Sequence, residues 1–145
     1  MNSTTCELCS AAGGRLIFDD GRARVVAIDE PEYPGFIRVI WNMHVREITD
    51  LSADDRMHLL RLVFAVEQAQ RSVLTPDKMN VASLGNMTPH LHWHLIPRYA
   101  DDAHFPGPIW SEQRRATPPV SLALRRARLP ELEQAIIQAL RLRDA

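Results

Sequence analysis

Seven consecutive residues, His90 to Ile96, alternate between histidine and large apolar side chains in the order His-Leu-His-Trp-His-Leu-Ile. A period of two is typical of a β-strand with one polar and one apolar face, since successive side chains of a strand point to opposite sides. His90, His92 and His94 are therefore predicted to share one face, with neighbours about 6.6 Å apart, so that their rings line one phosphate-sized ligand. The leucine and tryptophan side chains between them enter the core.

The other apolar runs predict the elements that surround this segment. Together with it they give about five strands, at residues 15–18, 23–28, 36–41, 79–84 and 90–97. Ser52 followed by Asp55 is close to a capping box, and apolar residues recur at helical spacing from there to Pro76, which predicts one long helix. Pro130 begins a short C-terminal helix. Hairpins interrupted by one long helix predict an α+β domain with a mainly antiparallel sheet.

The 145 residues are predicted to form a single domain, spanning 1–145. Its N-terminal segment, residues 1–14, contains the only two cysteines. Its last part, residues 100–145, is predicted to be a loop followed by the C-terminal helix, because residues 100–119 are rich in proline, aspartate and glycine and show no periodicity.

Composition excludes several classes of function. The net charge is −1, so nucleic-acid binding through bulk electrostatics is not expected. Arg61, Glu67 and Arg71 interrupt the most hydrophobic segment, which excludes a membrane span in the sequence given. Residues 1–6 have neither a basic nor an apolar stretch, so no signal peptide is expected and the predicted location is cytoplasmic.

Cys6 and Cys9 form a Cys-x-x-Cys pair, which in a reducing compartment suggests metal or redox chemistry. Two cysteines supply only half of a tetrahedral zinc site. From spacing alone, a pair of free thiols in a flexible N-terminus is favoured. Redox activity is disfavoured, because no thioredoxin-like βαβ pattern follows the pair.

Crowded imidazoles repel one another when protonated, so some of the three histidines are expected to be neutral near pH 7. Neutral imidazole acts as a nucleophile, a base or a metal ligand. A surface strand with solvated histidines is one alternative, and a catalytic metal centre is another, since His-x-His pairs on strands bind zinc in several hydrolase folds. Such centres also recruit a carboxylate, and Asp101 and Asp102 follow only after the segment, in the predicted loop.

The pattern His-φ-His-φ-His-φ-φ, where φ is apolar, resembles the signature of the histidine triad (HIT) family of nucleotide hydrolases and transferases. The resemblance covers roughly the first two-thirds of the chain, from Cys6-x-x-Cys9 through Asp29, the strand leading to His44 and the long helix to Pro97-Arg98. It implies a HIT-like sheet-and-helix domain that pairs into a homodimer and binds a nucleoside phosphate across the triad.

The resemblance also implies roles for single residues. His92 matches the nucleophile, which attacks the α-phosphorus to form a nucleotidyl-histidine, and His94 matches a contact to the α-phosphate. Asp29 matches a position that holds the ribose hydroxyls, and Asn86 lies where a polar side chain is near the phosphate or leaving group. Many relatives contact the leaving group through a serine or threonine shortly before the triad. This chain has Met87 there, with Thr88 one place later.

Some family members with an N-terminal cysteine pair bind a structural zinc ion. Its ligands are the two thiolates, the histidine that matches His44 and the first histidine of the triad, here His90. The resemblance thus implies a site made of Cys6, Cys9, His44 and His90, while the chemistry itself needs no cofactor. It also places His90 in the triad.

The sequence therefore favours an enzyme that cleaves at the α-phosphate of a nucleotide conjugate, either a dinucleoside polyphosphate or a nucleoside phosphoramidate. One alternative is a nucleotide-binding regulatory module with weak turnover, which fits the altered Met87 position. Another is a zinc-dependent hydrolase that uses the triad as ligands.

Overall fold

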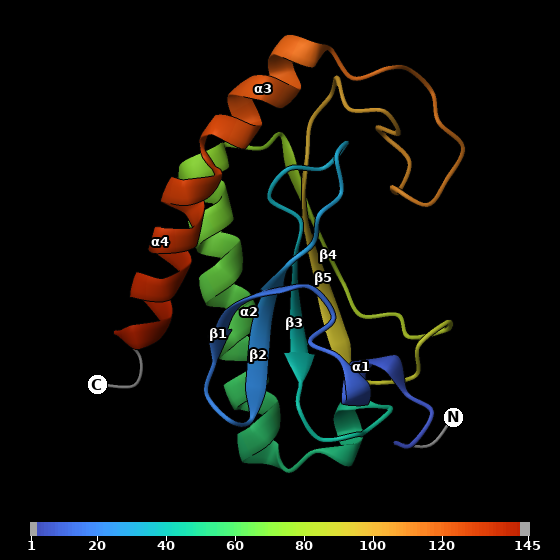
Figure 1. Ribbon diagram of the computed structural model, residues 1–145, viewed down its shortest axis with the longest axis vertical. Coiled ribbons are helices and arrows are strands. Elements are labelled where there is room, and N and C mark those ends of the chain that lie inside the picture. Colours follow the sequence, from blue (N-terminus) through green and yellow to red (C-terminus); the bar gives the residue numbers. More distant parts are fainter. Residues whose placement is uncertain (1–2, 143–145) are drawn as a thin grey trace.

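The predicted α+β fold is confirmed by the computed structural model, which describes residues 3–142 (Figure 1). Its sheet has five strands in the order β1-β2-β3-β5-β4, and every neighbouring pair is antiparallel. The strands are β1 Arg15–Asp19, β2 Ala23–Ala27, β3 Ile37–Trp41, β4 Lys78–Ala82 and β5 His92–Arg98.

The turn between β1 and β2 has the chemistry that its sequence predicts. Gly21 has a φ of +88°, a left-handed conformation that glycine adopts without steric strain. The Asp20 carboxylate accepts hydrogen bonds from the backbone N–H groups of Arg22 and Ala23. Local hydrogen bonds thus close the hairpin.

The long helix α2, Ala53–Leu74, begins and ends where the sequence indicates. The Ser52 side chain accepts a hydrogen bond from the backbone N–H of Asp55, and Thr75 ends the helix in a left-handed conformation just before Pro76. The apolar face of α2 packs on the sheet. None of the described helices is both long and apolar enough to cross a lipid bilayer.

The C-terminal part of the chain differs from the prediction by one helix. The expected helix is α4, Leu129–Arg141, which packs along α2, but a second helix, α3 Pro119–Ala127, precedes it. Leu122 is the only buried residue of α3, so this helix contributes little to the core. Two short helical turns were also not predicted, α1 Glu7–Ser10 and a 3-10 turn at Ile48–Asp50.

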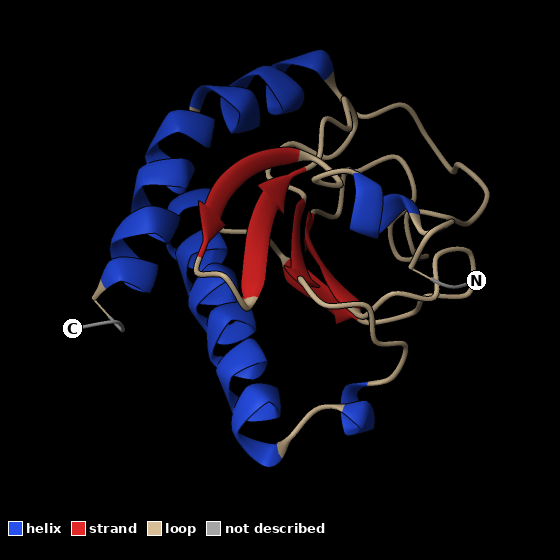
Figure 2. Cartoon of the chain, turned by 60° about the horizontal axis from the view of Figure 1, so that its bottom comes forward, coloured by secondary structure: helices blue, strands red, loops and turns tan. Residues whose placement is uncertain are grey.

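The two faces of the sheet are covered by different parts of the chain (Figure 2). Val25, Val39 and Leu95 belong to the main core that α2 and α4 complete. On the opposite face, Val26 and Ile40 form a smaller core with Cys6 and Leu8 from the N-terminal segment. Strand alternation therefore leaves His92 and His94 on the face away from α2, between the N-terminal segment and the loop after β5.

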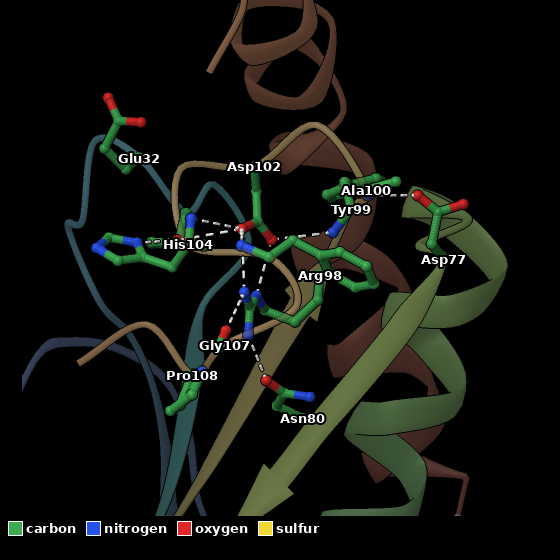
Figure 3. Close-up of polar contacts among 12 residues, drawn as sticks. Glu32, Asp77, Asn80, Arg98, Tyr99, Ala100, Asp102, His104, Gly107 and Pro108 are labelled. Atoms are coloured by element: carbon green, nitrogen blue, oxygen red, sulfur yellow. Dashed lines mark hydrogen bonds and ion pairs between the residues drawn. The ribbon is translucent and has the colours of Figure 1, made fainter. Parts of the chain in front are cut away.

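A buried ion pair fixes the loop that follows β5. The Arg98 guanidinium donates to both carboxylate oxygens of Asp102, and each of the two side chains is 1% exposed. Further N–H groups of Arg98 donate to the side chain of Asn80 and the carbonyl of Gly107 (Figure 3). Arg98 and its partners thus join the loop after β5 to the sheet, and Arg115 adds hydrogen bonds to the carbonyls of Asp102 and Phe105.

This ion pair also makes stability depend on pH. Burial raises the pKa of Asp102, but hydrogen bonds from Arg98 and from the backbone N–H groups of Tyr99 and His104 outweigh it and lower that pKa to about 2, from a usual 3.8. The folded state therefore keeps the carboxylate ionised at lower pH than the unfolded state. The resulting stabilisation is complete above about pH 4 and is lost as the pH falls through about 2.

Replacing Asp102 tests this account. Asp102→Ala should lower the free energy of unfolding by about 3 to 5 kcal/mol at neutral pH, because the Arg98 charge stays buried without its counter-charge. Urea denaturation measures the difference. The matched control is Asp54→Ala, which removes a partner of Arg22 that is 83% exposed and should cost about 1 kcal/mol or less. Equal losses in the two variants would contradict the role given to the buried pair.

Candidate functional site

Four potential metal ligands meet where the N-terminal segment reaches the sheet. The Nδ1 atom of His90 lies 3.4 Å from the Cys6 sulfur, 3.5 Å from the Cys9 sulfur and 3.3 Å from Nδ1 of His44. The Cys9 sulfur is also 3.4 Å from Nδ1 of His44. All four donor atoms lie within 4.8 Å of one another. The structure thus brings together the four residues of the predicted zinc site.

The spacing of these four atoms fits a tetrahedral zinc ion. Zinc bonds of about 2.0 to 2.1 Å to nitrogen and 2.3 Å to sulfur place tetrahedral ligands about 3.3 Å apart for two nitrogens and about 3.6 Å apart for nitrogen and sulfur. The distances from His90 to its three neighbours agree with these edges within about 0.2 Å. Four protein ligands leave no position for water, so the arrangement suits a structural ion.

Neighbouring groups hold two parts of this cluster in place. Nε2 of His90 donates to the carbonyl of Trp41 at 2.6 Å, which leaves the lone pair on Nδ1 facing the sulfurs. The Arg24 side chain donates to the carbonyls of Leu8, Ala11 and Ala12. A buried arginine on β2 therefore fixes the N-terminal segment in which both cysteines lie.

A cavity of about 400 Å³ opens next to the cluster. His92 and His94 of β5 line it together with Arg38 of β3, and Arg38 is paired with His94 in the strand register. Its remaining lining residues come from the N-terminal segment, the turn before β5 and the loop after it: Glu7, Leu8, Leu84, Gly85, Asn86, Met87, Thr88 and Trp110.

The hydrogen bond of His92 determines which of its ring nitrogens can react. Nδ1 lies 2.5 Å from the carbonyl oxygen of His90, and because a carbonyl only accepts, Nδ1 carries the proton. Burial lowers the pKa of His92, and the charge of Arg38 lowers it further, while the bond to the His90 carbonyl and the charge of Glu7 oppose the shift. A neutral ring of this tautomer has its lone pair on Nε2, which is a nucleophile.

His94 is a neutral neighbour of His92. Burial, followed by the charges of His92 and Arg38, lowers its pKa to about 4. Its ring is 4.8 Å from that of His92 and 5.1 Å from that of Trp110, both in edge-to-face geometry. At neutral pH, neither histidine gives the cavity a full positive charge.

The three histidines do not line a single site as the alternating pattern predicts. Strand β5 begins at His92, two residues later than expected, because the backbone N–H of Leu91 donates to the carbonyl of Val45 outside the sheet. The His90 ring consequently lies with Cys6, Cys9 and His44, while only His92 and His94 line the cavity. The His90 ring is on the sheet side where Cys6 packs, which is also the side of His92 and His94, but it does not line the cavity with them.

Two of the other three predicted substrate-binding residues line the cavity and the third does not. Asn86 and Thr88 line the cavity, and the Thr88 hydroxyl donates to the Glu7 carboxylate at 2.7 Å. Met87, between them, is 90% exposed. Asp29 is exposed beyond the end of β2 and is not among the lining residues.

Sequence reasoning overlooked two charged residues of the cavity. Arg38 is the one charged residue in the predicted strand Phe-Ile-Arg-Val-Ile-Trp, and a charge in a buried strand is a signal that could have identified it. Glu7 lies inside the Cys-x-x-Cys motif, so any metal site formed by that motif places it close by.

Comparison with known proteins agrees with this geometry. A sequence profile of the HIT domain matches residues 11–101, a range that includes all three triad histidines and His44 but begins after both cysteines. No curated protein sequence matches the chain.

Several solved structures of histidine triad proteins resemble the chain. One from Bradyrhizobium japonicum has a TM-score of 0.70 at 25% sequence identity, over 88% of this chain and 91% of its own. Another from Marinobacter aquaeolei has a TM-score of 0.69 at 28% identity, over 91% of this chain and 96% of its own. A zinc-bound family protein from Mycobacterium smegmatis has a TM-score of 0.58 at 24% identity, over 92% and 99%.

Proposed function

The chain belongs to the histidine triad family, whose members in general are nucleotide-binding hydrolases and transferases, and from this premise we propose that it cleaves nucleotide conjugates at the α-phosphate. The observation that carries the proposal is the tautomer of His92. Its Nδ1 proton is held by the His90 carbonyl, so a neutral ring offers Nε2 to the cavity.

The reaction has two displacements at phosphorus. In the first, the Nε2 lone pair of His92 forms a bond to the α-phosphorus, and the bond to the leaving group breaks with its electron pair going to the departing atom, which takes a proton from solvent. In the second, water attacks the same phosphorus, the P–N bond breaks back to Nε2, and one proton is released with the nucleoside monophosphate. Two steps through a covalent intermediate lower each barrier.

The other predicted residues take the roles that the family implies. His94 contacts the α-phosphate, and Asn86 and Thr88 lie on the leaving-group side, where their turn borders the cavity. Asp29 holds the ribose. Because Asp29 is exposed beyond the end of β2, the nucleoside must extend out of the cavity to reach it. Dinucleoside polyphosphates and nucleoside phosphoramidates are the proposed substrates.

The two alternative functions, a zinc-dependent hydrolase and a nucleotide-binding regulatory module, differ from this proposal in what they predict. A zinc-dependent hydrolase needs the triad histidines on one ion, whereas His90 groups with Cys6, Cys9 and His44 and not with His92 or His94. A regulatory module with weak turnover would share the cavity and bind nucleotides, but it would accumulate no covalent intermediate.

The nucleophile is tested by replacing His92. His92→Asn should lower turnover of adenosine phosphoramidate or diadenosine tetraphosphate by several orders of magnitude, because the Nε2 lone pair that attacks phosphorus is lost. Binding of the nucleoside monophosphate should stay within about tenfold. Mass spectrometry of the quenched wild-type protein should find the nucleotidyl adduct. Turnover near that of the wild type in His92→Asn would rule out the covalent route.

We also propose that Cys6, Cys9, His44 and His90 hold one structural zinc ion. The ion would tie the N-terminal segment to the sheet, and this segment supplies Glu7 and Leu8 to the cavity. Its contribution is to folding, since metal binding of this kind adds to the stability of the folded state.

Removal of the thiolates tests the zinc proposal. Cys6→Ser combined with Cys9→Ser should abolish zinc binding, lower the midpoint of thermal unfolding and loosen residues before Arg15 in hydrogen exchange. His92 chemistry should be affected less, and it should survive chelation in protein that stays folded. Metal analysis of wild type purified without chelator or affinity tag should find one zinc per chain, and far less than one would refute the proposal.

A homodimer stays a prediction for this chain. The edge strand β4 pairs only with β5 among the described residues, and exposed Phe64, Val81 and Leu84 lie beside it. A free edge next to apolar side chains favours pairing with a second copy. Sedimentation equilibrium should give twice the monomer mass of 16.5 kDa, and a monomer at micromolar concentration would contradict the prediction.

A further inference from the structure

Three arginines lie on the sheet face that carries His92 and His94. The strand register pairs Arg24 with Ile40, which is opposite His92, and pairs Arg38 with His94 directly. Arg98 lies on β5 at the same alternation as both histidines. All three side chains lie at least partly out of water, so each guanidinium needs partners for its N–H groups.

Two of these arginines are fully occupied by protein groups. Arg24 donates to three backbone carbonyls and to the side chain of Asn42. Arg98 donates to Asp102, Asn80 and the carbonyl of Gly107. Both are structural, since their charge and hydrogen bonds hold segments of this chain together.

Arg38 has no such partners. Its side chain makes no hydrogen bond or ion pair with the other residues among 3–142, and its Nε is buried without a hydrogen-bond acceptor. The guanidinium has a cation-π contact to the ring of Phe36, 5.7 Å away, and it feels the charge of Glu7 without a hydrogen bond to that carboxylate. A half-buried guanidinium without an acceptor lowers stability, so the arrangement is explained by something the folded chain alone does not supply.

An anion that enters the cavity would supply the missing acceptor. Nδ1 of His94 is a second buried atom without a hydrogen-bond partner, and it lines the same cavity as Arg38. Arg38 is the only arginine or lysine among the lining residues, and Glu7, the only acid, receives the Thr88 hydroxyl. The guanidinium of Arg38 stays charged in proteins, so Arg38 is the fixed positive charge of this site.

We propose that Arg38 binds the non-bridging oxygens of the phosphoryl group that is presented to His92. The inference rests on the proposed function, because that function names a nucleotide as the ligand. It adds Arg38 as the residue that binds the phosphate of this ligand. Planar guanidinium donates two parallel hydrogen bonds to a phosphate, with more strength than neutral donors have. The same bonds offset charge that builds up on those oxygens as Nε2 of His92 attacks.

The test compares 5′-monophosphates with nucleosides. Calorimetric titration of wild type with adenosine and guanosine, and with their 5′-monophosphates, gives the preference for the phosphate. Arg38→Gln should weaken monophosphate binding by about 10- to 100-fold and leave nucleoside binding within about twofold. Arg38→Lys keeps the charge but not the planar guanidinium, so its affinity for monophosphates should lie between those of wild type and Arg38→Gln. The matched control, Arg71→Gln on the exposed end of α2, should leave both affinities unchanged.

Stability separates ligand binding from a structural role. Arg38→Met removes an unpartnered guanidinium and keeps the length of the side chain, so the ligand-free variant should unfold at the same temperature as wild type or about 2 to 4 °C above it. If Arg38 had a structural role, the same substitution would lower the unfolding temperature. A fall of several degrees in Arg38→Met would overturn the proposal.

The remaining outcomes distinguish this proposal from the proposed function. If wild type forms no nucleotidyl adduct but its preference for monophosphates is lost in Arg38→Gln, the covalent chemistry fails and the role of Arg38 stands. If wild type turns over and Arg38→Gln retains the full preference and rate, only the role of Arg38 fails. Wild type that binds nucleosides and monophosphates equally, or binds neither, would also overturn it.

Discussion

One hydrogen bond, from Nδ1 of His92 to the carbonyl of His90, joins the two sites of this molecule. Strand β5 begins at His92, and the His90 ring just before it lies with Cys6 and Cys9. The same bond fixes the tautomer of His92. Anchoring of the N-terminal segment and presentation of Nε2 therefore involve two residues that are joined directly.

Local patterns were sufficient to predict most of the fold. The hairpin turn at Gly21, the cap at Ser52 and the stop before Pro76 act through neighbouring residues, and the structure places each where the sequence indicates. Helix α3 was missed because it has only nine residues and begins at Pro118 and Pro119, which end the proline-rich segment that was predicted to be a loop. Proline is tolerated in the first turn of a helix, so these two residues do not mark the end of helical structure.

The sites were predictable where one short motif or a family resemblance indicates the chemistry. Resemblance to a family, and not a single motif, predicted the group of Cys6, Cys9, His44 and His90 from three distant segments, while spacing alone favoured free thiols. Alternation predicted that His92 and His94 lie side by side, but it did not show that His90 groups with the cysteines, because tertiary contacts make that group. Arg38 and Arg24 look alike in sequence, and only the count of their partners in the folded chain tells them apart.

This difference between the arginines shows that the two faces of the sheet have different roles. The α2 face is closed by apolar side chains and carries the stability of the domain. On the other face, Arg24 donates to the N-terminal segment and Arg98 to the loop after β5, and both segments supply residues to the cavity. Arg38 lines the same cavity, and its side chain has no hydrogen-bond partner among the described residues. Unsatisfied groups persist in folded proteins where function requires them, and here two satisfied arginines fix segments that surround the unsatisfied one.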